Sequence, residues 1–334
     1  MTVQITIVGL GQIGSSIGLA LKARNLDLKI VGHDKDAQAA KESQKLGAVD
    51  DVKYNLPASV RGSKVVVLAL PFAGIRETLE VITPDLEEGS LVLDTAPSKA
   101  TIEAWTKELL PEGRYYIGLT PAINPDYLHS TEFGPKAARA DLFDKGLMVV
   151  TTPSGTPANV FNIGMEFVGL IGAVPLLMDN AEADGIFAAV HLLPQLAASA
   201  LLDATLDKPG WQEARKLAGR PYASVTSGLA FHDDAESLRD SVMGNRENVV
   251  RLLNNYISSL LRLRDAIEEG ESSELLDQIQ NNWRGRIRWF EERHAAEWLK
   301  HERQSIDTPS FGDRMNQMMF GSIFTPRKPR KGDS

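Results

Sequence analysis

A glycine-rich turn near the amino terminus constrains the fold of this chain more than any other stretch. A β-branched run over residues 5–8 leads directly into the turn, and apolar residues at helical spacing follow over residues 17–21. In such a strand–turn–helix unit Gly9 permits a tight turn, Gly11 lets the backbone approach a pyrophosphate, and Gly14 lets the helix pack on the strand. The free N–H groups at the start of the helix favour bound phosphates. The residues that we expect to bind a dinucleotide here are Gly9, Leu10, Gly11, Gln12, Ile13 and Gly14.

An acidic residue, Asp34, follows the last glycine by about twenty residues, the distance expected for ribose recognition. Its carboxylate accepts hydrogen bonds from the ribose of NAD and repels the 2′-phosphate of NADP. Lys35 stands next to it and offers a cation to that phosphate, so we expect NAD and keep NADP as the alternative. Leu70 and Pro71, at the end of a later apolar run, complete the expected cofactor site. An ordinary glycine-rich turn beside a surface aspartate is the competing interpretation.

Length and composition narrow the class of protein. A chain of 334 residues with 43% hydrophobic residues is long enough for two domains, each with a core. A net charge of −8 excludes a general attraction to nucleic acid or to anionic membranes. Cysteine is absent, which excludes disulfides, thiolate nucleophiles and cysteine-ligated zinc, and we expect no metal site. We expect a cytoplasmic protein, because the first strand begins too early for a signal peptide and no apolar run reaches the length of a membrane span.

Residues 1–152 alternate between strand-like and helix-like patterns. Residues 64–70 form a near-continuous apolar run, as in a strand that is buried on both faces. Strands that alternate with helices imply right-handed crossovers, and therefore an α/β fold with a doubly wound parallel sheet of the Rossmann type. Ligands of such sheets bind at the carboxyl ends of the strands. We therefore expect the chemistry in the loops after Val8, Leu70, Leu93 and Gly118.

Residues 153–304 follow helical periods and predict an all-α domain. The apolar segment 181–206 contains Pro194, which predicts a kink or a break in that helix. A helix over residues 237–267 carries one apolar stripe, which favours packing on other helices and on the second subunit of a homodimer. Residues 305–334 turn polar and basic, and we expect them to form a mobile tail.

Five motifs follow one another in an informative order. They are Gly9 to Ser16, Val31 to Lys35, Asp94 with Lys99, Ala140 to Gly146, and Leu238 to Ser241 followed by Asn245 to Glu247. With these motifs the chain resembles the prephenate/arogenate dehydrogenase family from about residue 3 to residue 300. The resemblance implies a Rossmann domain followed by a helical substrate and dimerisation domain. It also implies hydride transfer from a cyclohexadienol acid to NAD(P) with oxidative decarboxylation, a step of tyrosine biosynthesis.

Two departures from the pattern of that family concern catalysis. Thr120 occupies the position of the family's catalytic histidine, and a threonine hydroxyl forms hydrogen bonds but is no base near neutral pH. Pro97 occupies the position of a serine, with Ser98 next to it. Thr120, Ser98 and Lys99 are therefore catalytic candidates, the lysine because burial lowers the pKa of an ammonium group. The competing interpretations are hydrogen bonding within the strand-end turns for the two hydroxyls and a surface position for the lysine.

The other departures fall in the helical domain. His191 begins the segment that holds two histidines in the family, and Gln195 occupies the second histidine position, while Ser227 replaces the arginine of a carboxylate-binding turn. His191 is the candidate for a displaced acid–base group. The competing interpretation is a buried imidazole that hydrogen-bonds to a backbone carbonyl. His129, in the loop after residue 121, is a second candidate, and Arg220 would supply a displaced guanidinium. The expected substrate-binding residues are Thr120, Asn124, Gln195, Arg220 and Thr226.

Three functions fit these patterns. The first is an NAD(P)-dependent dehydrogenase of the prephenate/arogenate type. The second is a dehydrogenase or reductase on the same scaffold for a different small hydroxy or keto acid, because Thr120 and Ser227 replace the expected histidine and arginine. The third is a dinucleotide-binding protein without catalysis. The expected partners of the enzyme are a small-molecule acid and a second copy of the chain, with no nucleic acid and no membrane.

Overall fold

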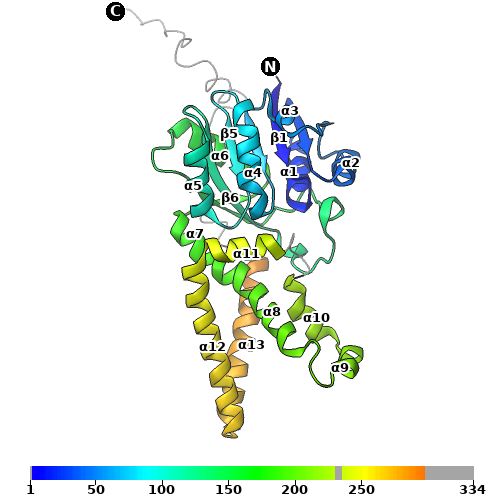
Figure 1. The fold of residues 1–334 in the computed structure, drawn as a ribbon, viewed down its shortest axis with the longest axis vertical. Coiled ribbons are helices and arrows are strands. Elements are labelled where there is room, and N and C mark those ends of the chain that lie inside the picture. The colour runs from blue at the N-terminus through cyan, green and yellow to red at the C-terminus, as the bar shows by residue number, and fades with distance from the viewer. Residues whose placement is uncertain (1, 230–234, 298–334) are drawn as a thin grey trace, which may run out of the picture.

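The structure of the chain is a computed structural model, which describes residues 2–229 and 235–297. Two parts follow one another along the chain. We call them the sheet domain, which ends at Leu177, and the helical domain, which begins at Asn180. Figure 1 shows the sheet domain at one end of the molecule and long helices that extend away from it.

The sheet contains eight strands in the order β3-β2-β1-β4-β5-β6-β7-β8. All neighbours are parallel except β6 and β7, which pair in antiparallel register. The predicted α/β fold with a doubly wound, mostly parallel sheet is therefore confirmed. The strands are β1 (Val3–Val8), β2 (Leu28–His33), β3 (Asp51–Val52), β4 (Val65–Leu68), β5 (Leu91–Asp94), β6 (Tyr115–Ala122), β7 (Leu147–Thr151) and β8 (Val174–Leu177).

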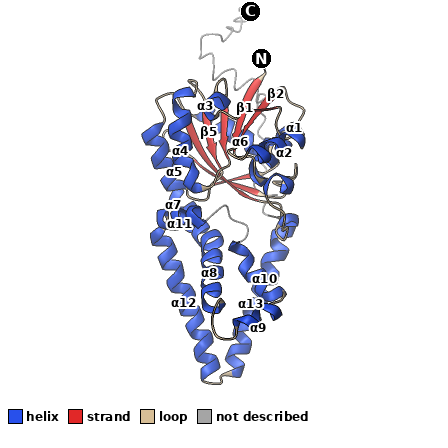
Figure 2. Cartoon of the chain, turned by 45° about the vertical axis from the view of Figure 1, so that its right-hand side comes forward, coloured by secondary structure: helices blue, strands red, loops and turns tan. Residues whose placement is uncertain are grey.

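Helices cover both faces of the sheet, as Figure 2 shows, because the central strands are apolar on both sides. In β4, Val65 and Val67 belong to one apolar core, whereas Val66 and Leu68 belong to the core on the opposite face. Helices α1 and α6 contribute to the first core, and helices α4 and α5 to the second. The helices of this domain are α1 (Gln12–Lys22), α2 (Ala37–Lys45), α3 (Leu56–Val60), α4 (Phe72–Ile82), α5 (Lys99–Leu109) and α6 (Ala158–Leu170), with short 3-10 turns η1 (Thr83–Asp85), η2 (Pro125–Tyr127) and η3 (Gly134–Ala137).

The sheet domain extends beyond the expected boundary at residue 152, so that prediction was wrong. Helix α6 crosses back over the sheet, and β8 pairs in parallel with β7, with Val149 opposite Leu176. Strand β8 contains Pro175, which lacks an N–H group and made the run look unlike a strand. Proline is tolerated there because β8 is the edge strand of the sheet.

The helical domain begins with a helix that changes its winding in the middle. A π-helical turn, η4 (Ala188–Leu192), separates α7 from α8, with Pro194 in the first turn of α8. The kink or break expected near Pro194 takes the form of this π-helical turn, and the helix continues across it as one span, Asn180–Thr205. The single helix expected over residues 237–267 was wrong, because the chain leaves helical geometry at Asn245, between α11 and α12. The helices are α7 (Asn180–Phe187), α8 (Leu193–Thr205), α9 (Trp211–Leu217), α10 (Arg220–Thr226), α11 (Ala235–Gly244), α12 (Arg246–Glu268) and α13 (Ser272–Ala295), and a 3-10 turn, η5 (Ser227–Leu229), follows α10.

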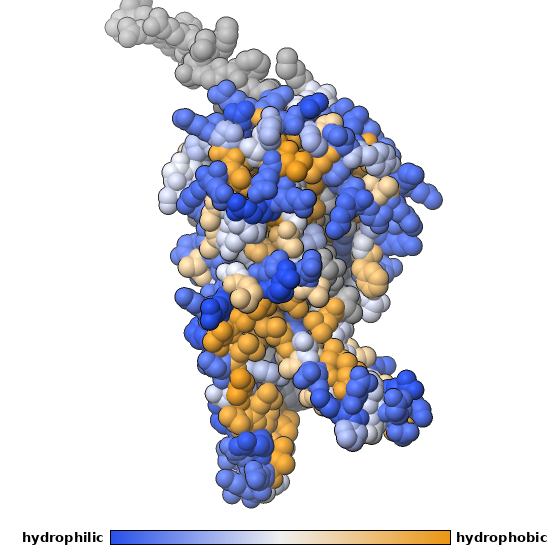
Figure 3. Space-filling model, in the orientation of Figure 1, coloured by the Kyte–Doolittle hydropathy of each residue, from blue (hydrophilic) through white to orange (hydrophobic). Residues whose placement is uncertain are grey.

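Helices α12 and α13 form a hairpin that extends away from the sheet domain (Figures 1 and 2). Large apolar side chains along it are exposed, among them Ile257 at 50%, Leu260 at 46% and Trp283 at 64%. Figure 3 shows hydrophobic surface over the part of the molecule that α11 and α12 form. A single copy of the chain therefore leaves an extended apolar face uncovered along this hairpin.

Among the described residues, the segment Asn180–Thr205 is long and apolar enough to cross a membrane by length and composition alone. The expectation that no apolar run reaches this length was therefore wrong. The helix continues through Pro194 because its π-helical turn absorbs the distortion. Only 28% of the most apolar window is buried within the chain. The uncovered part adds to the apolar surface of the helical domain.

Two glycines in helices provide a matched test of the packing. A Cβ atom on Gly18 of α1 would lie 2.2 Å from the Ala48 carbonyl oxygen, whereas one on Gly74 of α4 would have no atom within 4 Å. We expect Gly18→Ala to lower the free energy of unfolding by about 1–3 kcal/mol because the helix must move away from the backbone. Gly74→Ala should raise it by up to about 1 kcal/mol, since alanine restricts the unfolded chain. Urea unfolding of both variants measures the difference, and equal effects would contradict the close approach of α1.

Candidate active site

The glycine turn has the shape of a dinucleotide cradle. Gly9 adopts φ +92°, and a Cβ there would lie 2.2 Å from the Ala69 carbonyl oxygen, so the turn requires glycine. A Cβ on Gly14 would lie 1.9 Å from the Gly9 carbonyl oxygen, which shows how closely α1 approaches the end of β1. A Cβ on Gly11 would meet nothing within 4 Å, so this residue borders open space. The turn is thus closed on the protein side and open where a pyrophosphate would approach.

The start of α1 offers its amides to this open space. Among the described residues no side chain caps α1, whose first residues are Gln12 and Ile13. The Gln12 amide group donates to the Ala137 carbonyl at 3.3 Å, and the Ser16 hydroxyl accepts from the Arg139 amide at 3.0 Å. The segment around η3 is thereby held against α1. Uncapped amides at a helix start suit a phosphate group.

The Asp34 carboxylate connects the end of β2 to the glycine turn. One of its oxygens accepts from the Leu10 amide at 2.7 Å, and the other accepts from the Asp36 amide at 2.8 Å. Each carboxylate oxygen has further lone pairs, which suit ribose hydroxyl donors. Leu70 lies on the opposite side of the turn, and its Cδ2 would lie 3.0 Å from a Cβ on Gly9. These contacts fit an NAD-type ligand.

Pro71 completes this side of the turn, because it is the N-cap residue of α4 and follows β4, which ends at Leu68. The strand order changes direction between β1 and β4, and this switch point is where doubly wound sheets bind dinucleotides. A dinucleotide whose ribose is held by Asp34, on the β2 side, would extend toward β4 and β5 with its other half. The loop after β5, residues 95–98, is therefore the part of the sheet domain nearest to the expected chemistry.

A fully buried ion pair lies beneath that loop. The Lys99 ammonium donates to both carboxylate oxygens of Asp94, at 2.9 and 3.0 Å, and to the Leu119 carbonyl at 2.9 Å. The Tyr116 hydroxyl donates to the same carboxylate at 2.6 Å. Burial raises the pKa of Asp94 and lowers that of Lys99, while their mutual attraction opposes both shifts. Burial and the neighbouring carboxylate raise the pKa of Tyr116 well above its ordinary value.

Lys99 is therefore neither a surface residue nor a group that faces the expected ligand. It is 0% exposed, and its ammonium is occupied by Asp94 and Leu119. Its side chain fits because position 118 is glycine: a Cβ on Gly118 would lie 2.9 Å from the lysine Cδ atom and 2.5 Å from the Thr151 hydroxyl. The carboxylate that Lys99 binds belongs to the protein itself.

The two hydroxyl candidates near β5 and β6 differ. Thr120 is buried, and its hydroxyl donates to the Ala96 carbonyl at 2.8 Å, which ties the loop after β5 to β6. Ser98 is 2% exposed, and its Oγ has no hydrogen-bond partner among the residues that the structure describes. Thr120 thus hydrogen-bonds the backbone, the competing interpretation of its pattern, whereas the Ser98 hydroxyl is buried without a partner among the described residues.

Asn124 also serves a turn. Its side-chain oxygen accepts from the Asp126 amide at 3.1 Å, and its amide group donates to the Asp141 carbonyl at 3.2 Å. His129 is exposed, and its ring lies against Phe290 of α13 with 5.7 Å between the ring centroids. Neither residue lies in the loop after β5.

The candidates in the helical domain are spread over three elements, η4, α8 and α10. His191 lies half-buried in the π-helical turn, and its carbonyl accepts from the Gln195 side chain at 2.7 Å. The Gln195 Oε1 atom is buried and has no partner among the described residues. Thr226 donates to the Tyr222 carbonyl at 2.8 Å within α10, and Arg220 is exposed at the start of that helix. His191 and Gln195 are thus together, whereas no hydrogen bond or ion pair within the described part of the chain joins Arg220 to them.

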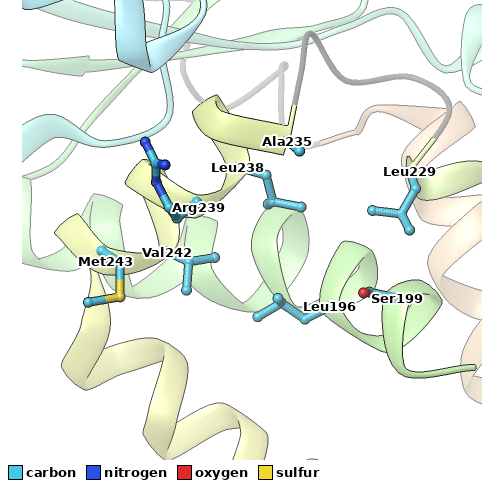
Figure 4. Close-up of a pocket in the computed structure, with 8 residues that line it drawn as sticks. All are labelled: Leu196, Ser199, Leu229, Ala235, Leu238, Arg239, Val242 and Met243. Atoms are coloured by element: carbon cyan, nitrogen blue, oxygen red, sulfur yellow. The ribbon is translucent and has the colours of Figure 1, made fainter. Parts of the chain in front are cut away.

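A cavity of about 520 Å³ opens between α8, η5 and α11 (Figure 4). Apolar side chains dominate its lining, with Arg239 and Ser199 as the polar members. The cavity lies wholly within the helical domain, away from the glycine turn. The lining residues are Leu196, Ser199, Leu229, Ala235, Leu238, Arg239, Val242 and Met243.

Sequence reasoning missed the residues that join the two domains. Asp184 of α7 accepts from the Lys99 and Ala100 amides at 2.6 and 3.1 Å, and Asn245 donates to the Asp184 carbonyl at 2.6 Å. Burial raises the pKa of Asp184, against the two amide donors and the Lys99 ammonium. An aspartate within an apolar helical segment was the available signal, since carboxylates that become buried need partners.

Comparisons with known proteins agree on one family. A model described as the prephenate dehydrogenase nucleotide-binding domain matches residues 17–177, and one described as the prephenate dehydrogenase dimerization domain matches residues 179–281. Cyclohexadienyl dehydrogenase of Zymomonas mobilis is 26% identical over 288 residues, which cover 85% of this chain and 94% of that protein. Prephenate dehydrogenase of Bacillus subtilis is 23% identical, with 81% of this chain and 72% of that protein covered. The crystal structure of A. aeolicus prephenate dehydrogenase with hydroxyphenyl propionate and NAD+ shares the fold, with a TM-score of 0.74, 21% identity, and coverage of 86% of this chain and 98% of that one.

The buried ion pair makes a prediction about stability. We expect Lys99→Met to lower the free energy of unfolding by about 3–5 kcal/mol, because it leaves the Asp94 carboxylate buried without its cation. The double variant Asp94→Asn/Lys99→Met should lose clearly less, since it removes both charges. Urea unfolding measures both values, and an equal loss in the two variants would contradict the pairing.

Proposed function

This chain belongs to the prephenate dehydrogenase family, and we propose that it oxidises a cyclohexadienol acid, prephenate or arogenate, with loss of the ring carboxylate. It is an NAD(P)-dependent oxidoreductase with a Rossmann-type cofactor domain and a helical domain. The observation that carries the proposal is the glycine cradle closed by Asp34, combined with family matches that span both domains. The place in metabolism that we propose is tyrosine biosynthesis, in the cytoplasm.

The cofactor fits the residues present, with NAD preferred and NADP as the alternative. When bound, the nicotinamide supplies the hydride acceptor of the reaction. The chain holds the pyrophosphate with the amides at the start of α1, above Gly11, where a side chain is absent. Asp34 holds the ribose with its carboxylate, whose position two backbone amides fix in advance. Leu70 and Pro71 bound the other half of the cradle, toward β5.

A proton must leave the substrate hydroxyl as hydride departs, and we assign this role to His191. Thr120 cannot take it, because its hydroxyl donates to the Ala96 carbonyl and has no basic pKa near neutrality. Lys99 cannot take it either, since its ammonium is enclosed with Asp94. His191 is half-buried in a π-helical turn, a form of helix that occurs often at functional sites, and shares a helix stripe with Gln195.

Replacement of this imidazole should change the pH dependence of the reaction. We expect His191→Gln to lower kcat by on the order of 100-fold and to flatten the dependence of kcat on pH, because the general base is lost. His129→Gln is the matched control, since His129 is exposed against Phe290 and should leave the profile unchanged. An unaltered profile in His191→Gln would exclude the assignment.

A second candidate function concerns the substrate. Neutral side chains, Thr120 and Gln195, stand where the family's pattern has histidines, and Arg220 is exposed on α10. This neutral lining favours a site that tolerates a different small hydroxy or keto acid on the same scaffold. The two functions differ only in the substrate that is turned over.

The direct test mixes the purified chain with NAD and either prephenate or arogenate and follows the absorbance of the reduced cofactor. We expect turnover with one of the two acids, with NAD giving a higher kcat/KM than NADP because Asp34 repels a 2′-phosphate. Turnover only with other hydroxy acids would favour the second candidate. Cofactor binding without hydride transfer to any of them would indicate a binding protein instead.

We also propose a homodimer formed through the helical domain, which the dimerization-domain match and the uncovered hairpin support. Trp283→Arg on α13 should shift sedimentation toward the monomer, because it places a charge in the apolar face. Leu46→Arg in the sheet domain is the control, since Leu46 is 46% exposed far from the hairpin in the chain. A wild-type chain that sediments as a monomer at micromolar concentration would refute the dimer.

A further inference from the structure

Helix α5 begins in an unusual way. Its N-cap residue is Ser98, with extended backbone at φ −111° and ψ 93°, the geometry in which serine commonly accepts a hydrogen bond from the second or third amide of the helix. Here Ser98 makes no such bond. A good capping residue is therefore in the right place but does not cap its own helix.

The cap comes from the other domain instead. Asp184 of α7 accepts from the Lys99 amide at 2.6 Å with one carboxylate oxygen and from the Ala100 amide at 3.1 Å with the other. A carboxylate at a helix start also meets the positive end of the helix dipole, so it is a stronger cap than a neutral hydroxyl. Asn245, where α11 meets α12, donates to the Asp184 carbonyl at 2.6 Å and fixes its backbone. The position of the carboxylate is thus determined by the helical domain.

Because Asp184 caps α5 in place of Ser98, the Ser98 hydroxyl is left without a partner. Ser98 is 2% exposed, and its Oγ atom has no hydrogen bond within the described part of the chain. A buried polar group without a partner destabilises the fold, and proteins retain such groups at functional sites. Ser98 lies in the loop after β5, on the side of the sheet toward which the dinucleotide extends from Asp34.

We infer that Asp184 is a positioning residue: by capping α5 from the helical domain, it releases the Ser98 hydroxyl to hydrogen-bond the substrate. This inference rests on the proposed dehydrogenase function. The chemical class that Ser98 recognises is a hydroxyl or carboxylate oxygen on the ring acid, since a serine hydroxyl both donates and accepts. Substrate recognition then depends on contact between the two domains, because Asp184 reaches α5 only while they are packed together.

A double-mutant cycle tests the dependence. Ser98→Ala should lower kcat/KM about tenfold, the value of one hydrogen bond to the substrate. Asp184→Ala should lower kcat/KM at least tenfold in the wild-type background, because the serine turns back to cap α5. In the Ser98→Ala background Asp184→Ala should lower kcat/KM by less than about twofold, since there is no hydroxyl at position 98 that could turn from the substrate to the helix. Independent, multiplying losses would overturn the inference. If Asp184→Ala does not fold, Asp184→Asn keeps one accepting oxygen and should show the same coupling at smaller size.

A matched control separates positioning from helix stability. Asp179 caps its own helix, α7, by accepting from the Glu182 amide at 2.8 Å. Asp179→Ala should reduce the free energy of unfolding but show no coupling to Ser98→Ala. Equal coupling for Asp179 and Asp184 would overturn the specific role of Asp184.

Hydrogen exchange of the Ala100 amide tests the inference without any measurement of enzymatic activity. In Asp184→Ala the Ala100 amide should keep most of its protection from exchange, because Ser98 replaces the lost cap. In the double variant with Ser98→Ala this protection should fall. Equal loss in both variants would show that Ser98 does not compete for the cap, and would overturn the inference. Inactivity of the wild-type chain on both ring acids would instead refute the proposed function while leaving this measurement valid.

Discussion

The Asp94–Lys99 ion pair is the interaction on which the arrangement of the site depends. It lies under the carboxyl ends of β5 and β6 and joins them, because the lysine bonds to Asp94 of β5 and to the Leu119 carbonyl of β6. The same lysine is the first residue of α5, so the loop between β5 and α5 is held at both ends. Burial makes each charge dependent on the other, since either one alone would cost several kcal/mol. The loop that carries Ser98 is thereby fixed before any ligand binds.

Much of the fold was predictable because its signals are local. The glycine turn, the apolar strands and the acidic residue after β2 each follow from short-range chemistry, and the structure places them as expected. The end of the sheet was not predictable from the same signals, since Pro175 hides β8 and only pairing with β7 reveals it. The break at Asn245 was missed because apolar residues at helical spacing lie on both sides of it, Leu238 and Val242 before it and Val249 after it.

The site was less predictable, because tertiary contacts decide where a polar side chain lies and which group it bonds to. Lys99 has the same sequence pattern whether it lies on the surface or in the interior, and the space left by Gly118 decides between the two. The role of Asp184 depends on α5, which lies 85 residues away in the chain. Thr120 and Asn124 follow the simpler of their two interpretations and satisfy nearby backbone. Ser98 departs from that interpretation because Asp184 accepts the hydrogen bond of the Ala100 amide, which Ser98 would otherwise accept.

The π-helical turn between α7 and α8 has a consequence for how this segment can vary. A regular helix rotates by about 100° per residue, and a π-helical turn accommodates roughly one additional residue, so side chains beyond it are turned by about that angle. The direction of Gln195 relative to Asp184 is therefore set by a residue count, not by residue type. Deletion of a single residue from Ala188–Leu192 would rotate α8 about its axis relative to α7 and leave the side chains of α8 unchanged. Insertions and deletions in this turn therefore change which side chains of α8 face a ligand, without any change in the residues of α8 themselves.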